Sequence, residues 1–289
     1  MSPIIKDDRK KIVITGGSGF LARRIVFHYG ETHDILTPTH QELDITDAEN
    51  CMEYMKKEHP DVVIHCAAIA STVVCEENPR LSKSVNVEGP IHIAKACKSV
   101  GAKMIYASSD QVYNGSETTE LGVETDIVAP INVYGRDKIE AENAVMEIVD
   151  AVCLRLPWMC DKTSDDFPEH ADFYSNFCNK ISKREVMMFS PYDLRSITNV
   201  HDVAENIIKT ISIPGGVYNF ASTGKLSSYE IAKGVIKNLY PDDEEVQALI
   251  QIYPDATPER GRNLTMDMSK LEAYGIYFPD SITSISKLM

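Results

Sequence analysis

The chain has 289 residues, of which 43% are hydrophobic and 25% are charged, a composition typical of a soluble globular protein with one large or two modest domains. Its formal net charge of −14 argues against binding to the phosphate backbone of nucleic acids, so we expect no nucleic-acid partner. The N-terminal sequence MSPIIKDDRKK has no apolar signal core, and no apolar run approaches the length of a membrane span. We therefore expect a cytoplasmic protein without a membrane partner.

The cysteines support the same compartment. There are seven of them, an odd number without a C-x-x-C pair, and several lie in apolar runs, as Cys66 and Cys153 do. We expect reduced thiols packed in the core, and no metal site.

The stretch around the first glycines, KIVITGGSGFLA at 11–22, organises the chain. Residues 12–14 form a β-branched apolar run typical of a strand buried on both faces, and apolar residues return at helical spacing after the glycines. A strand, a turn and a helix in this order direct backbone N–H groups and the positive end of the helix dipole at the turn, which suits a phosphate. Gly16, Gly19 and Ala22 allow a tight turn, the approach of a pyrophosphate and close helix packing. We expect a dinucleotide site here; an ordinary strand–helix turn is the alternative.

Strands and helices then alternate. We predict strands at 34–37, 61–68, 103–109 and 149–156, and helices at about 47–58 (with Asp47 as N-cap), 79–101 and 132–148. Most connections are too long for hairpins, which predicts an α/β fold with a doubly wound parallel sheet of six or seven strands and helices on both faces. Past Pro157 we predict an irregular and helical stretch at 158–190, strands at 195–200 and 217–220, and helices at 202–211 and 229–239. We expect a dinucleotide-binding domain of residues 1–155 and 191–222, and a smaller, discontinuous substrate-binding lobe of 156–190 and 223–289.

Tyr134 and Lys138 place a phenol and an ammonium four residues apart, on one face of the predicted helix. A phenol has a reference pKa of about 10, and a nearby lysine cation lowers it by favouring the phenolate. Such a pair can move a proton at a carbonyl or alcohol oxygen. Ser109 follows the strand at 103–109, at the sheet edge where the glycine turn would put a cofactor. A core tyrosine on an exposed helix, and a turn hydroxyl, are the structural alternatives.

The segments TGGSGFLA (15–22), HCAA (65–68), Asn86, ASSDQVYNG (107–115) and the Tyr134–Lys138 spacing together resemble an extended short-chain dehydrogenase/reductase. Within that superfamily the chain is similar to the dTDP-4-dehydrorhamnose reductases over nearly its whole length. The further matching segments are LDITD (43–47), VNVEGP (85–90), PINVYGRDK (130–138), LRLPW (154–158) and MDMSKLEAYG (266–275).

This resemblance implies an NADP(H)-dependent reductase of a nucleotide-diphosphate 4-keto-6-deoxy sugar, in which hydride passes from a reduced nicotinamide to a sugar ketone. Tyr134 would donate the proton, Lys138 would hold the nicotinamide ribose and lower the tyrosine pKa, and Ser109 would complete the catalytic set. The implied cofactor-binding residues are Gly16, Gly19, Phe20, Leu21, Arg23, Asp44, Ile45, Cys66, Ala67, Ala68, Asn86, Tyr134 and Lys138. The implied substrate-binding residues are Ser108, Asp110, Gln111, Trp158 and Arg195. The oligomeric state stays open, with a homodimer as the candidate assembly.

Some positions depart from the reductase pattern. Gln111 stands where those enzymes usually have an aromatic residue, Val74-Cys75 replaces a more polar pair, and Arg195 resembles the phosphate-side arginine of other nucleotide-sugar enzymes. A nucleotide-sugar epimerase or 4,6-dehydratase is therefore one alternative. The glutamine amide disfavours dehydration because it cannot serve as a proton-transferring base. A cofactor-binding regulatory subunit without catalysis is the other.

The second strand bears on the choice of cofactor. An NAD site normally has an acidic side chain about 20 residues past the first glycine, where it holds the ribose 2′-OH. Counting from Gly16 reaches residues 36–38, Leu-Thr-Pro, none of which is acidic. Arg23, Arg24 and His40 could supply positive charge for a 2′-phosphate. We therefore expect NADP(H) to be preferred over NAD(H), with Glu42 or Asp44 as the residues that would instead favour NAD if the loop folds back.

Overall fold

The computed structural model describes residues 9–116, 120–162 and 172–288. The chain divides into two compact units, each built from three segments. Unit 1 comprises Met1–Val112, Pro130–Arg155 and Ala204–Tyr218, and unit 2 comprises Tyr113–Ala129, Leu156–Val203 and Asn219–Met289.

The core of unit 1 is a six-stranded sheet of order β10-β5-β4-β3-β1-β2. The strands are β1 (Lys11–Thr15), β2 (Asp34–Leu36), β3 (Val62–His65), β4 (Lys103–Ser109), β5 (Val152–Leu156) and β10 (Gly216–Asn219). The pairs β1–β2, β1–β3 and β3–β4 are parallel. The predicted α/β class with a doubly wound sheet is confirmed. The apolar run 12–14 is fully buried, as expected for a strand covered on both faces.

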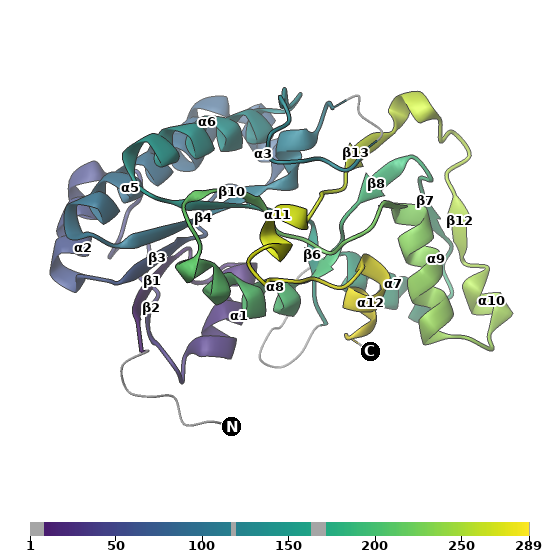
Figure 1. The fold of residues 1–289 in the computed structure, drawn as a ribbon. Helices are drawn as coiled ribbons and strands as arrows, with labels where there is room; N and C mark the ends of the chain where they lie inside the picture. The colour runs from purple at the N-terminus through teal and green to yellow at the C-terminus, as the bar shows by residue number, and fades with distance from the viewer. Residues whose placement is uncertain (1–8, 117–119, 163–171, 289) are drawn as a thin grey trace. The chain divides into compact units, whose positions relative to one another are not determined.

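Helices cover both faces of this sheet. Helices α2 (Ala48–Glu58), α5 (Gly89–Val100) and α6 (Val133–Ile148) lie on one face, and α1 (Phe20–Tyr29) and α8 (Val200–Ile207) lie on the other (Figure 1). The predicted N-cap is confirmed, because the Asp47 side chain accepts hydrogen bonds from the backbone N–H groups of Glu49 and Asn50. A continuous apolar core joins α2, α5 and α6 to the strands beneath them.

The single long helix predicted at 79–101 is instead three consecutive pieces. These are α4 (Pro79–Lys83), a π-helical turn η1 (Ser84–Glu88) and α5, and the short helix α3 (Thr72–Glu77) precedes them. Pro90 explains the irregular turn, because proline has no N–H to donate to the carbonyl of Asn86 one α-helical turn earlier. The turn carries Asn86 at a fully buried position.

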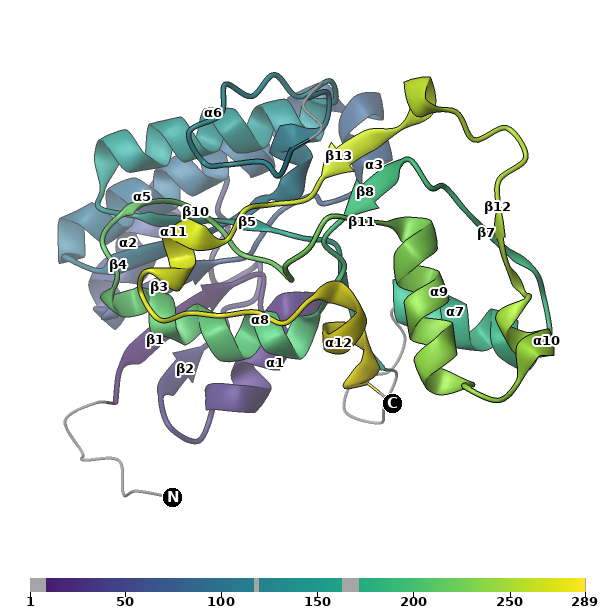
Figure 2. The same ribbon diagram turned by 45° about the vertical axis from the view of Figure 1, so that its right-hand side comes forward.

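Unit 2 contains three small sheets and short helices. Among the described residues, one sheet has three strands, in the order β11-β8-β13, and the other two have two strands each, β12-β7 and β6-β9. The strands are β6 (Met159–Cys160), β7 (Met187–Phe189), β8 (Asp193–Arg195), β9 (Thr198–Asn199), β11 (Leu226–Ser227), β12 (Ile250–Ile252) and β13 (Arg262–Leu264). The helices are α7 (Phe173–Ser182), α9 (Ser228–Leu239), α10 (Glu244–Gln247), α11 (Ser269–Glu272) and α12 (Ser281–Ser286). Helices α7 and α9 pack together beside β7 and β12 around an apolar cluster (Figure 2).

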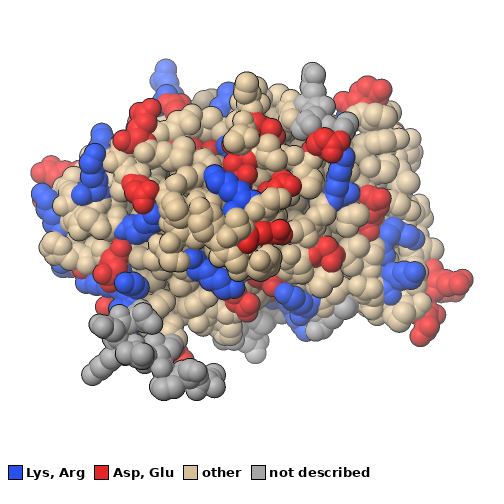
Figure 3. Space-filling model, viewed as in Figure 1, with Lys and Arg blue, Asp and Glu red and all other residues tan. Residues whose placement is uncertain are grey.

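The short 3₁₀ turns η2 (Asp110–Tyr113), η3 (Ile208–Ser212) and η4 (Pro258–Arg260) complete the elements. On the face drawn in Figure 3, acidic and basic side chains are interspersed. Among the described residues, no helix is both long enough and apolar enough to cross a membrane.

Candidate functional site

The glycine turn between β1 and α1 has the geometry of a phosphate cradle. Gly16 has a φ of +68°, and a Cβ there would lie 2.8 Å from the Cα of Ala67, so only glycine fits. Gly19 caps α1, and its backbone N–H donates to the carbonyl oxygen of Gly16 at 2.8 Å. No acidic residue lies in the first turn of α1, so the positive end of the helix dipole is not neutralised there.

A cavity of about 750 Å³ opens beside this turn. It is lined by five of the predicted cofactor residues, Gly16, Arg23, Asp44, Ile45 and Ala67. It is also lined by Thr15, Gly17, Ser18, Thr37, Pro38, Thr39, His40, Leu43, Thr46 and Val85. The other predicted cofactor residues are not in its wall: Gly19, Phe20, Leu21, Cys66, Ala68, Asn86, Tyr134 and Lys138. The loop after β2 does fold back, so Asp44 reaches the cavity although it lies well past the end of the strand.

The basic residues near the cavity separate into two groups. Arg23 lines the wall, whereas Arg24 is only 3% exposed and stacks over the Phe20 ring at 4.3 Å. Arg24 is therefore a core residue and leaves the set of candidate phosphate ligands. His40 lies 3.9 Å from the Asp44 carboxylate, which also accepts hydrogen bonds from the backbone and side chain of Thr46.

A buried histidine, His65, contacts the part of the cavity wall that Thr15 and Ala67 form. The Thr15 hydroxyl lies 2.9 Å from His65 Nδ1 and accepts a hydrogen bond from the backbone N–H of Ala67. Burial lowers the pKa of His65 to about 3, so the ring is neutral at physiological pH. In the sequence His65 is only the first residue of the HCAA segment, because a lone histidine at the end of a strand does not by itself indicate a role.

Tyr134 and Lys138 lie one turn apart on α6, as their spacing predicts. The helix begins there because the Asn132 side chain accepts a hydrogen bond from the backbone N–H of Gly135 at 2.7 Å. Both side chains are buried, with Lys138 only 2% exposed. The Lys138 ammonium donates to the carbonyl oxygen of Ala107 at 2.8 Å. Helix α6 is thereby attached to the end of β4, where Ser109 stands.

Burial shifts these two pKa values in opposite directions. It raises the pKa of Tyr134 well above its usual value, against a smaller lowering by a hydrogen bond with Ser109. It lowers the pKa of Lys138 to about 8. From the Tyr134–Lys138 spacing we expected a lowered tyrosine pKa. The structure gives the opposite direction because loss of solvent outweighs the stabilisation of the phenolate. Tyr134 therefore keeps its proton at neutral pH.

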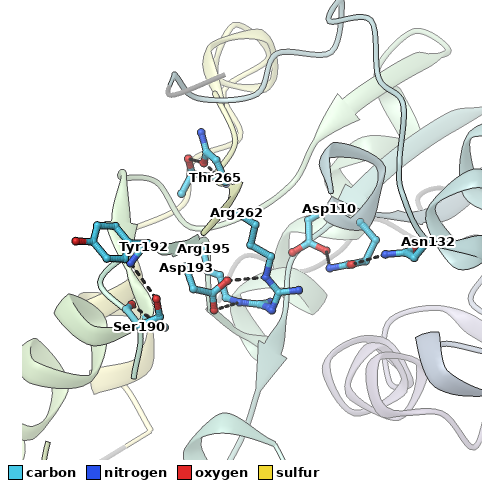
Figure 4. Close-up of polar contacts among 11 residues, drawn as sticks. Asp110, Asn132, Ser190, Tyr192, Asp193, Arg195, Arg262 and Thr265 are labelled. Carbon is cyan, nitrogen blue, oxygen red and sulfur yellow. Dashed lines mark hydrogen bonds and ion pairs between the residues drawn. The ribbon is translucent and has the colours of Figure 1, made fainter. Parts of the chain in front are cut away.

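Polar side chains after β4 form a chain toward the start of α6. The Ser109 hydroxyl donates to the Asp110 carboxylate at 3.2 Å, and the Gln111 amide donates to the same oxygen at 3.3 Å. Asn132 in turn donates to the Gln111 side-chain oxygen at 3.1 Å (Figure 4). Gln111 thus connects Asp110 to the N-cap of α6, a use for glutamine that an aromatic side chain could not fill.

Asn86 supports the loop after β3. Its amide oxygen accepts from the backbone N–H of Ile69 at 2.9 Å, and its amide nitrogen donates to the carbonyl oxygen of Ile69 and to the Ser82 hydroxyl. Ser82 donates to the buried Asp137 carboxylate on α6. Asn86 is therefore well placed to hold the loop that follows Ala67, rather than to contact a ligand in the cavity.

Ser108 is also buried, and its hydroxyl donates to the Glu142 carboxylate on α6 at 2.5 Å. The side chain is committed to the core, so we do not carry Ser108 forward as a substrate contact. Sequence analysis missed Glu142 and its second partner Arg155. Only the register of α6 along the sheet brings these residues together.

In unit 2, Asp193 joins two arginines. Its carboxylate accepts from Arg195 Nε at 2.8 Å and from Arg262 Nε at 2.6 Å (Figure 4). The Arg195 guanidinium stacks over the Trp158 ring at 5.0 Å, and Trp158 is 41% exposed. The two predicted substrate residues are thus neighbours. Arg262, which sequence analysis missed, is the more exposed of the two arginines. One carboxylate cannot neutralise two guanidinium groups, so the cluster keeps positive charge.

Comparisons with known proteins point to one family. The family described as "RmlD substrate binding domain" matches residues 10–286. The dTDP-4-dehydrorhamnose reductase of Mycobacterium tuberculosis H37Rv is 30% identical over 249 residues, covering 82% of this chain and 78% of that protein. The methionine adenosyltransferase 2 subunit beta of Xenopus laevis is 29% identical over 296 residues, covering 94% and 86%.

Solved structures agree. A dTDP-4-dehydrorhamnose reductase from Bacillus anthracis, in complex with NADP, has a TM-score of 0.82 at 25% identity and covers 97% of this chain and 98% of its own. A UDP-glucose 4-epimerase from Thermotoga maritima, with UDP-glucose, has a TM-score of 0.77 at 19% identity, with 96% of each chain covered. At that identity the epimerase shows a shared fold only.

Proposed function

The chain belongs to the RmlD substrate-binding domain family, within the extended short-chain dehydrogenases/reductases, and we propose that it is an NADP(H)-dependent reductase of a nucleotide-diphosphate 4-keto-6-deoxy sugar. The observation that carries the proposal is the buried cluster of Ser109, Tyr134 and Lys138 at the end of β4. These are the residue types that an oxidoreductase needs to protonate the oxygen of a ketone as it is reduced.

The residues around the cavity fit a dinucleotide. The left-handed φ of Gly16 and its close approach to the Ala67 backbone shape the tight turn, and the start of α1 offers backbone N–H groups to an anion. Arg23 on α1 lines the cavity, as do Thr37, Thr39 and His40 after β2, so a ribose 2′-phosphate would find a guanidinium and hydroxyl groups there. We infer that this wall favours NADP(H), with Asp44 as the residue that opposes it.

When bound, the cofactor would supply a hydride to the carbonyl carbon of the sugar. Tyr134 donates its proton to the carbonyl oxygen. The hydride brings both electrons and one hydrogen to the carbon, and the tyrosine proton completes the alcohol. The raised pKa of Tyr134 suits a group that must hold a proton until the oxygen becomes basic. Ser109 holds the same oxygen by a hydrogen bond, and the Lys138 ammonium stabilises the phenolate that is left behind.

In unit 2, Arg195 and Arg262 are the residues that we propose to bind the diphosphate of the substrate. Their shared partner Asp193 orients both guanidinium groups. A guanidinium group can bind a phosphate through two parallel N–H···O hydrogen bonds. Trp158 would lie against the nucleotide sugar beside them. We accordingly propose that unit 1 binds the cofactor and unit 2 binds the nucleotide part of the substrate.

The test is an assay of NADPH oxidation. The purified full chain is mixed with NADPH and each of a panel of dTDP-4-keto-6-deoxy sugars, and the absorbance of the reduced nicotinamide is measured over time. We expect turnover with at least one sugar, and the product should be the corresponding alcohol. Exchange of configuration without net oxidation of NADPH would instead indicate an epimerase.

A second candidate is a regulatory subunit that binds the cofactor without catalysis. The similarity to methionine adenosyltransferase 2 subunit beta favours it. Tight NADPH binding without turnover of any sugar, together with stable association with a methionine adenosyltransferase catalytic subunit, would support this candidate and contradict the reductase. The presence of Ser109, Tyr134 and Lys138 near the end of β4 favours the reductase.

A further inference from the structure

Helix α6 presents three buried ionisable side chains at successive turns. They are Tyr134, Lys138 and Glu142, and Glu142 is 1% exposed. The first two belong to the proposed catalytic set, whereas nothing in the proposed reaction uses the third. A carboxylate that is removed from water at a cost of several kcal/mol needs an explanation.

The Glu142 carboxylate is held from two strands. Its Oε1 accepts from the Ser108 hydroxyl on β4 at 2.5 Å and from Arg155 Nε on β5 at 3.2 Å. Its Oε2 accepts from Arg155 Nη2 at 2.9 Å. Arg155 is itself only 3% exposed, so the pair is fully desolvated and its guanidinium is bound at two points. A buried pair of this kind seldom stabilises a fold more than apolar residues of equal volume would.

The same end of β4 also holds the lysine. Ser108 binds Glu142, and the preceding residue, Ala107, accepts the hydrogen bond from the Lys138 ammonium. Two consecutive residues of one strand therefore set the position of α6 through side chains one turn apart. Because Tyr134 lies a further turn along, a shift of α6 along β4 would displace the phenol from Ser109.

The charge on Glu142 also matters to Lys138. The ionisable groups that act on the ammonium are Cys66 after β3, Cys75 on α3, and Asp137 and Glu142 on α6. The rings of Tyr106 on β4 and Tyr134 on α6 lie against it, and the neutral His65 on β3 is a further ionisable neighbour. The Cys66 thiol is neutral in this setting, since burial raises its pKa to about 12. Burial also raises the pKa of Asp137. Glu142 is thus the carboxylate best placed to favour the charged form of the lysine.

We propose that Glu142 is a positioning residue, clamped by Ser108 and Arg155, which fixes α6 on β4 and keeps the Lys138 ammonium charged beside Tyr134. The catalytic meaning of this arrangement rests on the proposed function. Its physical content, the position of α6 and the charge on Lys138, does not.

The test uses Glu142→Gln, the double variant Glu142→Gln/Arg155→Met, Ser108→Ala, and Glu140→Gln as a matched control on the exposed side of α6. The double variant is included because Glu142→Gln alone leaves the buried Arg155 charge without its partner and can unfold the chain. The readout is the titration of Lys138 by NMR in the full chain labelled with [13Cε]lysine, with the signal assigned by its loss in Lys138→Met.

We expect Lys138 to titrate at least about 0.5 pH units lower in Glu142→Gln than in the wild type, because an anionic neighbour has been removed. The double variant also removes the Arg155 cation, so we expect a smaller shift in the same direction, since Glu142 is the member of the pair that acts on Lys138. Glu140→Gln should leave the titration unchanged, since Glu140 pairs with Lys83 at the surface. A purely structural ion pair predicts otherwise: the double variant would then recover both thermal stability and the wild-type titration. An unchanged Lys138 titration in Glu142→Gln overturns the inference. If that variant does not fold, an unchanged or raised titration in the double variant overturns it.

The positioning part is tested by kinetics. Ser108→Ala keeps both charges but removes one bond of the clamp, so we expect kcat to fall about tenfold with KM for NADPH little changed. An unchanged kcat overturns this part. If the wild-type chain reduces no sugar, the proposed function fails, while the lysine titration still decides whether Glu142 maintains the charge.

Discussion

The Lys138 ammonium lies 5.5 Å from the centre of the Tyr134 ring, one turn away along α6. Both groups are buried, and burial keeps the phenol protonated while it makes the ammonium easier to deprotonate. An acid that holds its proton and a cation that can stabilise the resulting phenolate are what the protonation of a ketone oxygen requires.

Replacement of Tyr134 by Phe should cut kcat by a factor on the order of 10²–10⁴, because the ring is kept while the proton donor is lost. The dissociation constant for NADPH should stay within about twofold, since the phenol lies outside the cavity wall. Stopped-flow turnover and fluorescence titration measure the two quantities. Unchanged turnover would remove Tyr134 from the mechanism.

Replacement of Arg195 or Arg262 by Ala should raise KM for the nucleotide sugar by about 10- to 100-fold, because each loses charge-assisted hydrogen bonds to a phosphate. Binding of NADPH should be unaffected. Arg184→Ala is the matched control, because that arginine is exposed and pairs with Glu245 at the surface. If neither variant changes KM or kcat, the phosphate role of the cluster around Asp193 is wrong.

We expect the choice of cofactor to depend on Arg23. Replacement of Arg23 by Ala should weaken NADPH binding about tenfold and leave NADH binding nearly unchanged, because only NADPH carries the 2′-phosphate. Isothermal titration with both reduced cofactors measures the ratio, and Arg80→Ala, an exposed arginine outside the cavity, serves as the control. Tighter binding of NADH than of NADPH by the wild type would contradict the preference itself and would assign the ribose to Asp44.

His65 should make the fold sensitive to acid. Its folded-state pKa of about 3 lies below the ordinary value of 6.5. Between these two pH values His65 binds a proton in the unfolded chain but stays neutral in the folded chain. This contribution to stability is complete above about pH 6.5 and is lost as the pH falls toward 3, at about 1.4 kcal/mol per pH unit. Urea unfolding should therefore show that the free energy of unfolding falls between pH 7 and pH 5 by about 2 kcal/mol less in His65→Asn than in the wild type. Equal losses would mean that His65 is protonated in the fold.

Local patterns were enough to predict much of unit 1. The strand at 103–109 and the helix start at Asp47 have the predicted bounds, because β-branched runs, caps and helical spacing act within a few residues. The glycine turn was readable for the same reason: the left-handed φ of Gly16 is a property of the chain at that point. The division of the 79–101 segment into three helical pieces was harder to predict from the sequence, since the effect of Pro90 on the preceding turn depends on how the helix is packed.

The sequence by itself therefore determined the main alternation of strands and helices in unit 1, the glycine turn, and the four-residue spacing that puts Tyr134 and Lys138 on one side of α6. Tertiary structure alone decided what surrounds them. It buried Tyr134, so the pKa of the phenol is raised where the sequence led us to expect a lowered value. It placed the Arg24 side chain in the core against Phe20, and it paired the Ser108 hydroxyl with Glu142. Spacing is a local property of the backbone, whereas desolvation and pairing depend on residues that are distant in sequence and meet only when the chain folds.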